Sequence, residues 1–418
     1  METKDWILLS LSFAPLILVF LYSYNYEVFY FLYNYSGVRA IVEKIHPPIE
    51  GAKDDYRRPS TFMLWAVSIY VALFSIASAR YDRAVNSYEM QITAWQAQMA
   101  TEYRGEACAN VKNLQSSKTP LKPNITKPWT TLASFFTNEI HIEGKDLIRN
   151  TICAYRQSLR NAVLKNSNLA RLNLHKSNFS NANLVGADFS NTNLENSNFK
   201  DSILCSANLF NVTITDSELS GSNLIKANLK RAYIRHTNAT KTTLEYANLQ
   251  QSDLLGSNFN FSNFDNSDLS HANISMANMT ASSFYKSNLR QVLAIETQFK
   301  QSRLKKACLT NATLDGANFN KANLVQTNFT NATLTYANFS GANLENSDFT
   351  NTDLLGTCFH DSYLVCTNLA SSKRLTAKQL YTVNTLYKAK LPKKIKKELR
   401  KAYPHLFEKP IWYHEPKN

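Results

Sequence analysis

The residues best suited to chemistry are a group of cations near the C-terminus. Between residues 388 and 401 they are opposed only by Glu398, and they are Lys388, Lys390, Lys393, Lys394, Lys396, Lys397, Arg400 and Lys401. We call this group the basic cluster. Such a run is often a solvated helix face, but it can also bind a polyanion, either lipid headgroups or nucleic acid.

A third interpretation is that the basic cluster packs onto its own chain. Residues 322–370 contain no Lys or Arg and hold Glu345, Asp348, Asp353 and Asp361. A cap folded onto them would meet opposite charge, although exposed ion pairs are worth only about 0–1 kcal/mol each. The sequence leaves the three interpretations open. As a partner for the cluster, it favours these acids over lipid, and lipid over nucleic acid.

No residues of the sequence suggest a catalytic site. The sequence has no GxSxG, HExxH, P-loop or GxGxxG pattern. Its six cysteines lack CxxC and CxxH spacing, which would indicate zinc. Cys108 and Cys153 flank one predicted linker, so they could pair, although free thiols are favoured. We therefore predict no catalytic, cofactor-binding or metal-binding residues, and no enzyme.

The longest regular feature is a period of five residues. From Leu164 to Leu369, 42 positions spaced five apart are Leu, Phe, Ile or Met in all but two cases, and we call each a centre. Two residues before each centre stands Ala, Ser or Thr in 39 cases, and Asn or Asp lies between them in 27. A period of five fits neither a helix nor a strand, but it fits a chain that turns a corner every five residues.

Four such sides would close a coil of 20 residues. Centres 20 apart would then stack, and the column from Phe179 to Phe359 collects seven of the twelve Phe centres. The column from Leu174 to Leu354 has none. About ten coils, stacked at the strand spacing of about 4.8 Å, predict a rod on the order of 50 Å long.

This pattern resembles the pentapeptide-repeat family, whose motif is A(D/N)LXX. The resemblance covers about half of the chain and implies an all-β solenoid, a right-handed quadrilateral β-helix. A solenoid needs caps, because its terminal coils would otherwise leave open strand edges. Fold alone does not imply function.

The N-terminal region predicts a transmembrane hairpin. Residues 6–24 and 61–79 are two uncharged runs of 19 residues, each about 28 Å long as a helix and flanked by charge. Counts of Lys and Arg near the spans place the connecting loop on the cytoplasmic side and both termini outside. The family's soluble members are mostly cytoplasmic, which favours the opposite orientation. We expect an integral protein with two spans, in a bacterial inner membrane, and leave the side of the soluble part open.

The predicted organisation follows the chain in order. Its parts are the first span with its loop (1–60), the second span (61–80), a helical stalk and Pro-containing linker (81–128), an N-terminal helical cap (129–161), the β-helix (162–370) and a basic helical cap (371–418). In the last part, Thr376 and Gln379 form a predicted capping box. Leu380, Val383, Tyr387 and Leu391 would line one helix, and Pro392 would begin a second.

Charge separates the candidate functions. Residues 159–370 carry 17 Lys and Arg against 15 Asp and Glu, so the rod is almost neutral. Mimicry of nucleic acid, as in the gyrase-inhibiting branch of the family, needs a strongly acidic rod. We therefore predict a membrane-tethered scaffold for an unknown protein partner. The alternatives are a mimic acting on a topoisomerase, or polyanion binding by the basic cluster. The oligomeric state is left open.

Overall fold

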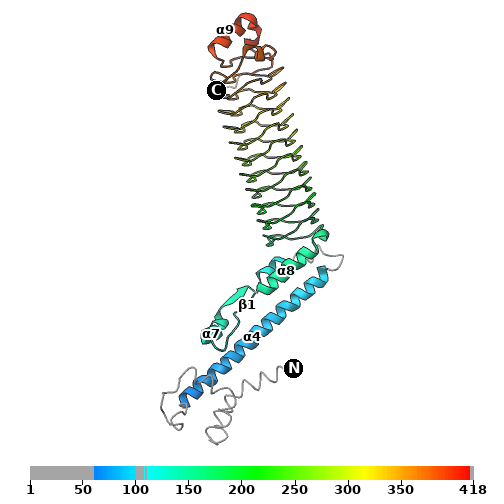
Figure 1. Ribbon diagram of the computed structural model, residues 1–418, viewed down its shortest axis with the longest axis vertical. Coiled ribbons are helices and arrows are strands. Elements are labelled where there is room, and N and C mark those ends of the chain that lie inside the picture. The colour runs from blue at the N-terminus through cyan, green and yellow to red at the C-terminus, as the bar shows by residue number, and fades with distance from the viewer. Residues whose placement is uncertain (1–60, 100–107, 109–110, 141, 415–418) are drawn as a thin grey trace. The chain divides into compact units, whose positions relative to one another are not determined.

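The computed structural model describes residues 61–99, 108, 111–140 and 142–414. The chain divides into two compact units (Figure 1). One contains residues up to Ala94 together with Ser116–Lys145. The other contains Trp95–Gln115 and everything from Asp146 onward.

In the first unit, a short helix and a small sheet lie beside one long helix. The long helix is α4 (Thr61–Met99), which belongs to this unit as far as Ala94, and the short one is α7 (Pro128–Phe136). Strand β1 (Lys118–Pro120) pairs antiparallel with β2 (Asn138–Ile140). The Tyr70 hydroxyl donates to the carbonyl of Ile125 (2.7 Å), and the Arg80 guanidinium donates to that of Phe135 (2.9 Å). Both contacts join α4 to the segment that contains α7.

The predicted transmembrane hairpin is not supported. Its first span, residues 6–24, lies outside the described residues. The second span is helical, but α4 continues without a break through Arg80, Asp82 and Arg83 to Met99. No helix in the described part of the chain is both long enough and apolar enough to cross a membrane.

The predicted linker and N-terminal cap also need correction. Within the linker, Val111–Ser116 forms α6, and β1 follows it. Pro128 opens α7, where its missing N–H is not needed. Helix α7 belongs to the first unit, whereas the sequence predicted it as part of a cap on the solenoid.

The second unit contains the predicted solenoid. Parallel bridges join residues 20 apart, as in Asn168↔Asp188 and Asp188↔Asn208, so each coil has four sides of five residues, as predicted. Centres and small residues are buried along its whole length. Phe rings stack between coils, with centroids 4.8 Å apart for Phe319 and Phe339, which confirms the Phe column. The core is therefore a stack of apolar layers along one axis.

The left-handed position of the turns accepts residues of many types, although the scarcity of Gly suggests that the turns rely on Asn, Asp and Ser. The second residue after every centre from Leu164 to Leu364 has a positive φ, and this includes Lys306, Phe261 and Tyr336. Asn acts at an earlier position. In many sides, the Oδ1 atom of the outward Asn accepts the N–H two residues later, as Asn168 does from Ala170 (3.1 Å). The Asn side chain thus fixes the backbone of the turn. The residue after the bonded N–H, which is Arg171 in this side, takes the left-handed conformation.

Side chains from α6, η3 (Arg156–Ser158) and α8 (Ile142–Ala154) close the N-terminal edge of the solenoid. The amide of Gln115 donates to the carbonyl of Asn168 (2.8 Å) and accepts its N–H (2.7 Å). Arg149 and Arg156 donate to the carbonyls of Ala170 and His175. The first coil is therefore capped by amide and guanidinium groups, where another coil would otherwise supply backbone atoms.

The C-terminal cap differs from its prediction in one segment. The first predicted helix is only a 3₁₀ turn, η4 (Ala377–Leu380), and the chain then returns to the solenoid. Thr385 and Lys390 bridge to the last coil, while Leu386 and Leu391 are buried. The prediction of a helix over 380–391 is therefore wrong.

The second predicted helix of the cap does form. It is α9 (Lys393–Ala402), which begins after Pro392, and a 3₁₀ turn, η5 (Pro404–Phe407), follows it. Leu399 is fully buried, and the carbonyl of Leu406 accepts the N–H of Leu386 (2.6 Å). These elements cover the last sides of the solenoid.

Candidate interaction surfaces

The four faces of the solenoid differ in what they offer a partner. We name each face after its first centre: the Leu164, Leu169, Leu174 and Phe179 faces. On every face, the residue before the centre points outward and bridges to its equivalents in the neighbouring coils. Each face is therefore a flat ladder of outward side chains, with corner residues along its edge.

The Leu169 face is a polar ladder. Its outward positions are Asn or Asp in every coil except at Cys308. Neighbouring rungs bond to each other, as Asn208 does to Asp188 (2.9 Å) and Asn288 to Asp268 (3.0 Å). Its polar groups are thus partly satisfied within the ladder, and no large apolar side chain is exposed on its described residues.

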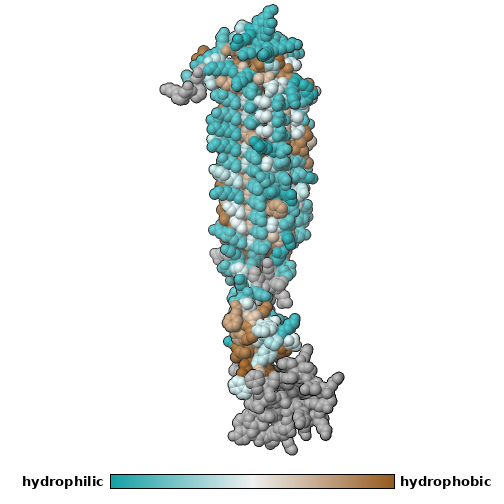
Figure 2. Space-filling view, turned by 90° about the vertical axis from the view of Figure 1, so that its left-hand side faces the viewer, coloured by the Kyte–Doolittle hydropathy of each residue, from teal (hydrophilic) through white to brown (hydrophobic). Residues whose placement is uncertain are grey.

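The Leu174 face carries most of the exposed apolar surface of the solenoid. Eight large apolar side chains are exposed between residues 162 and 370, and five of them lie on this face: Tyr233, Met276, Leu293, Tyr336 and Leu355. Met276 and Tyr336 are the most exposed, at 61% and 70%. They extend over six coil steps, about 30 Å at the usual strand spacing. In Figure 2 the visible surface of the solenoid is mostly hydrophilic and carries separate hydrophobic patches.

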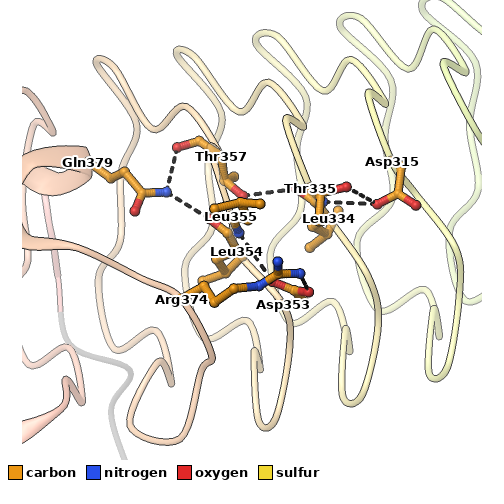
Figure 3. Close-up of polar contacts among 9 residues, drawn as sticks. All are labelled: Asp315, Leu334, Thr335, Asp353, Leu354, Leu355, Thr357, Arg374 and Gln379. Atoms are coloured by element: carbon orange, nitrogen blue, oxygen red, sulfur yellow. Dashed lines mark hydrogen bonds and ion pairs between the residues drawn. The ribbon is translucent and has the colours of Figure 1, made fainter.

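Polar contacts break up and border these apolar residues. Arg235 forms an ion pair with Asp253 (2.5 Å), beside Tyr233. Toward the C-terminus, Asp315 accepts the N–H of Thr335 (3.1 Å), and Arg374 pairs with Asp353 (Figure 3). Apolar residues bordered by satisfied polar groups are the usual anatomy of a protein–protein interface.

A glycine lies under the most exposed ring of the Leu174 face. A Cβ atom on Gly356 would lie 2.6 Å from Cδ1 of Tyr336, so the ring rests directly over that glycine. Gly356 also has a φ of +67°. The corner thus combines a residue without a side chain with an aromatic ring from the preceding coil, and Tyr336 is held against the surface while 70% exposed.

The basic cluster lies at the C-terminal end of the second unit. Six of its residues are on α9, and Lys388 and Lys390 are on the last sides of the solenoid. All except Lys396, which is half-buried, are exposed. Arg400 lies over the Phe407 ring (5.3 Å), and Lys388 lies over Tyr387 (5.5 Å). Beyond α9, Ile411 is fully exposed and Trp412 is 49% exposed.

The acids predicted to receive the basic cluster have other partners. Asp353 pairs with Arg374, which is outside the cluster, and Asp361 pairs with His360 (3.1 Å). Asp348 accepts from Asn368 (3.0 Å). Among the described residues, no ion pair joins the cluster to these acids. Ion pairs with these acids therefore do not explain the cluster.

The described part of the chain brings together no group of His, Cys, Asp and Glu that could hold a metal ion. All six cysteines are free, including Cys108 and Cys153. Burial raises the pKa of the Cys108 thiol to about 12. Burial also raises the pKa of Cys308, but hydrogen bonds from Thr310 and Arg290 outweigh this effect, and the pKa falls below its usual value. Cys308 therefore has more thiolate character than an ordinary cysteine.

The family model for pentapeptide repeats matches in eight copies and covers about half of the chain. The matched segments are 158–196, 182–221, 207–245, 244–280, 282–320, 314–351 and 327–369. The chain belongs to the pentapeptide-repeat family. Its solenoid is accordingly the right-handed β-helix of that family.

Solved pentapeptide-repeat structures resemble this chain in part. HetL, a protein of the cyanobacterium Nostoc involved in heterocyst differentiation regulation, is 24% identical over 53% of this chain and 95% of its own, with a TM-score of 0.24. Trypsin-treated QnrB1, a plasmid-mediated fluoroquinolone resistance protein, is 16% identical over 46% and 96%, with a TM-score of 0.36. Rfr23 of the cyanobacterium Cyanothece is 36% identical over 22% and 58%, with a TM-score of 0.18. No curated protein matches the chain.

The pentapeptide pattern could have revealed the Leu174 face. Outward positions prefer Asn or Asp, so Tyr233 and Leu293 depart from the motif and mark the same face in different coils. Sorting the departures by their position within the coil would have gathered them. The exposed Trp412 has no such signal, because it lies outside the repeats.

Proposed function

We propose that this pentapeptide-repeat protein is a non-catalytic scaffold that binds a protein partner along the Leu174 face. The observation that carries this proposal is the unequal distribution of exposed apolar residues, five on that face and none on the Leu169 face. All faces share one backbone, so the repeat itself does not require the difference. Exposed aromatic and aliphatic side chains bordered by polar groups are what protein interfaces use as anchors.

Site-specific photocrosslinking in cells tests this proposal. A photoreactive amino acid at Leu293 should give a discrete crosslinked product. The matched control is Asn288, which holds the same outward position in the same coil on the Leu169 face. A product of equal yield at both positions, or at neither, would count against the proposal. A product of twice the chain mass would identify a second copy as the partner.

A second candidate function is polyanion binding by the basic cluster. It is favoured by the exposure of the cations on α9 and by the other partners that Asp348, Asp353 and Asp361 have. Exposed Ile411 and Trp412 favour a lipid surface over nucleic acid, because burying apolar side chains at the boundary between headgroups and acyl chains strengthens membrane binding. Replacing Lys393, Lys394, Lys396 and Lys397 with Gln should weaken binding to anionic vesicles and leave thermal unfolding unchanged. A melting temperature that falls while vesicle binding persists would point back to a structural role.

Mimicry of nucleic acid is the weakest candidate, because residues 159–370 are almost neutral. Inhibition of gyrase supercoiling by the purified protein would revive it. We further propose that the protein acts at a bacterial inner membrane. Support comes from the uncharged run at residues 6–24 and not from a second membrane-crossing helix.

A further inference from the structure

Helix α7 exposes its large apolar residues and buries its small polar ones. Thr131 and Ser134 are 0% and 1% exposed. Trp129 and Phe136, which are 81% and 86% exposed, lie on the opposite side of the helix together with Leu132. A nine-residue helix surrounded by water normally shows the reverse pattern. The outward stripe of α7 therefore fits an apolar surrounding better than water.

Helix α4 also exposes large apolar side chains, mainly in its first half. Before Arg80, Trp65, Ile69 and Ile76 share one exposed stripe, while Val67, Ser75 and Ala77 are buried. After Arg80 the usual pattern returns: Tyr88 and Ile92 are buried, polar residues are exposed, and Met90 is the one large apolar exception among the described residues. One continuous helix thus changes its preferred surroundings near Arg80.

Side chains of α4 donate to four backbone carbonyls in and before α7. Arg80 donates to the carbonyls of Ser134 and Phe135, which belong to the last turn of α7. Tyr70 donates to the carbonyls of Asn124 and Ile125. Free carbonyls at a helix end would resist transfer out of water, and these contacts reduce that cost.

Cations determine how such a surface can meet a bilayer. Lys118, Lys122 and Lys127 are exposed, and no Asp or Glu occurs between residues 111 and 138. The contacts of Tyr70 put the segment from Lys122 to Lys127 beside α4 at a point ten residues, about 15 Å, before Arg80. If α4 crossed the bilayer, these cations would be held deep in hydrocarbon, which is costly. If α4 lies in the plane of the membrane, they remain among the headgroups.

We infer that α7 and the first half of α4 form a docking surface that lies in the plane of an anionic membrane. The Trp, Phe, Leu and Ile side chains of the two stripes enter the boundary between headgroups and acyl chains. Lys122 and Lys127 contact the anionic headgroups. The docking surface rests on the proposed membrane location and does not depend on protein binding by the Leu174 face.

The test uses the full chain bound to vesicles of phosphatidylglycerol and phosphatidylcholine, part of which carries brominated acyl chains. The run at residues 6–24 can hold the chain on a vesicle by itself, so the readout must be local. Bromine quenches nearby tryptophans, and a Trp129→Phe variant isolates the contribution of Trp129. The control is Trp95→Phe, because Trp95 is buried on the polar half of α4.

Trp6 and Trp65 should also be quenched, so we expect Trp129→Phe to remove a distinct share of the bromine-sensitive loss of fluorescence and Trp95→Phe to remove little. Bromine near the headgroups should quench more than bromine near the chain ends. Unquenched Trp129 in vesicle-bound protein would overturn the inference. So would protection of Trp129 from an aqueous quencher in the absence of vesicles, because a second copy or another part of the chain would then cover the stripe.

A charge variant tests the role of the lysines. Lys122→Gln with Lys127→Gln should weaken the binding of the full chain to anionic vesicles and reduce its sensitivity to salt. Lys305→Gln with Lys306→Gln removes the same charge from an exposed corner of the solenoid and should have no such effect. Equal effects of the two pairs would show a response to net charge alone and contradict the assigned surface. Neither result bears on crosslinking at Leu293, so the two proposals fail separately.

Discussion

Replacing Gln115 with Leu should loosen the first coil of the solenoid and leave distant coils unchanged. Gln115 is 7% exposed, and its amide both donates to and accepts from the backbone of Asn168. Leucine fills a similar volume but offers neither group. The variant therefore leaves one backbone N–H and one carbonyl at the solenoid edge without their partner.

The expected loss follows from these two hydrogen bonds. Each contributes about 0.5–1.5 kcal/mol net, so the local opening free energy should fall by about 2 kcal/mol. Because 1.4 kcal/mol corresponds to a factor of ten, amide exchange near Asn168 should rise by roughly thirtyfold. A solenoid repeat contacts only its neighbours, so the effect should fade within a few coils.

Hydrogen–deuterium exchange with mass spectrometry provides the measurement. Peptides around Asn168 should exchange faster in Gln115→Leu, and peptides around Leu249 should not. The control Gln250→Leu removes one side-chain bond to Asp268 (2.7 Å) and no backbone partner, so the first coil should be unaffected. Unchanged exchange at Asn168, or faster exchange along the whole solenoid, would refute the reasoning.

Two further results are expected. Leu249→Ala should lower the free energy of unfolding by about 2–5 kcal/mol in thermal melts, because a fully buried centre is replaced by a cavity. Gln250→Ser, at a half-exposed position, should be close to neutral, and equal damage by both would contradict the assigned orientation of the repeat. Cys308 should react with a thiol reagent at lower pH than an ordinary cysteine, because its pKa is lowered and the thiolate is the reactive form. Cys108, whose pKa is raised to about 12, should stay unreactive through neutral pH, and mass spectrometry of the labelled peptides would show a reversed order if this reasoning is wrong.

The solenoid could be predicted almost completely from the sequence because its period is strict. Each inward position repeats one simple requirement, a large apolar residue or a small one. The Phe column also predicted the number of residues in one coil, because the rings of successive coils stack on each other, as Phe299 and Phe319 do. The same strictness hid the last sides of the solenoid. Leu386 and Leu391 follow residues that bridge to the last coil, but a two-residue shift in the period made them look helical.

Other features depend on contacts that no local pattern encodes. Gln115 caps Asn168 across 53 residues, and α7 lies against α4 through Tyr70 and Arg80. Hydropathy alone made residues 61–79 resemble a membrane span. It carried no information about which of their side chains face α7 and which remain exposed. The apolar face of the solenoid was detectable in principle, but only after the departures from the motif were sorted by face.

Protein binding by the Leu174 face is the proposal on which the assigned function depends. The affinity of the crosslinked partner for matched surface variants tests it most directly. Leu293→Asp adds a charge where the interface should be apolar, and Asn288→Asp adds the same charge to the Leu169 face. We expect Leu293→Asp to weaken binding by about tenfold or more, the effect of losing about 1.4 kcal/mol at an interface anchor. Asn288→Asp should leave the affinity unchanged, and Leu293→Asp should keep the wild-type melting temperature. Because Asn288→Asp replaces a hydrogen bond to Asp268 with like-charge repulsion, its affinity is measured below its own melting temperature. Equal affinities for Leu293→Asp and wild type, in correctly folded protein, would contradict the proposed function.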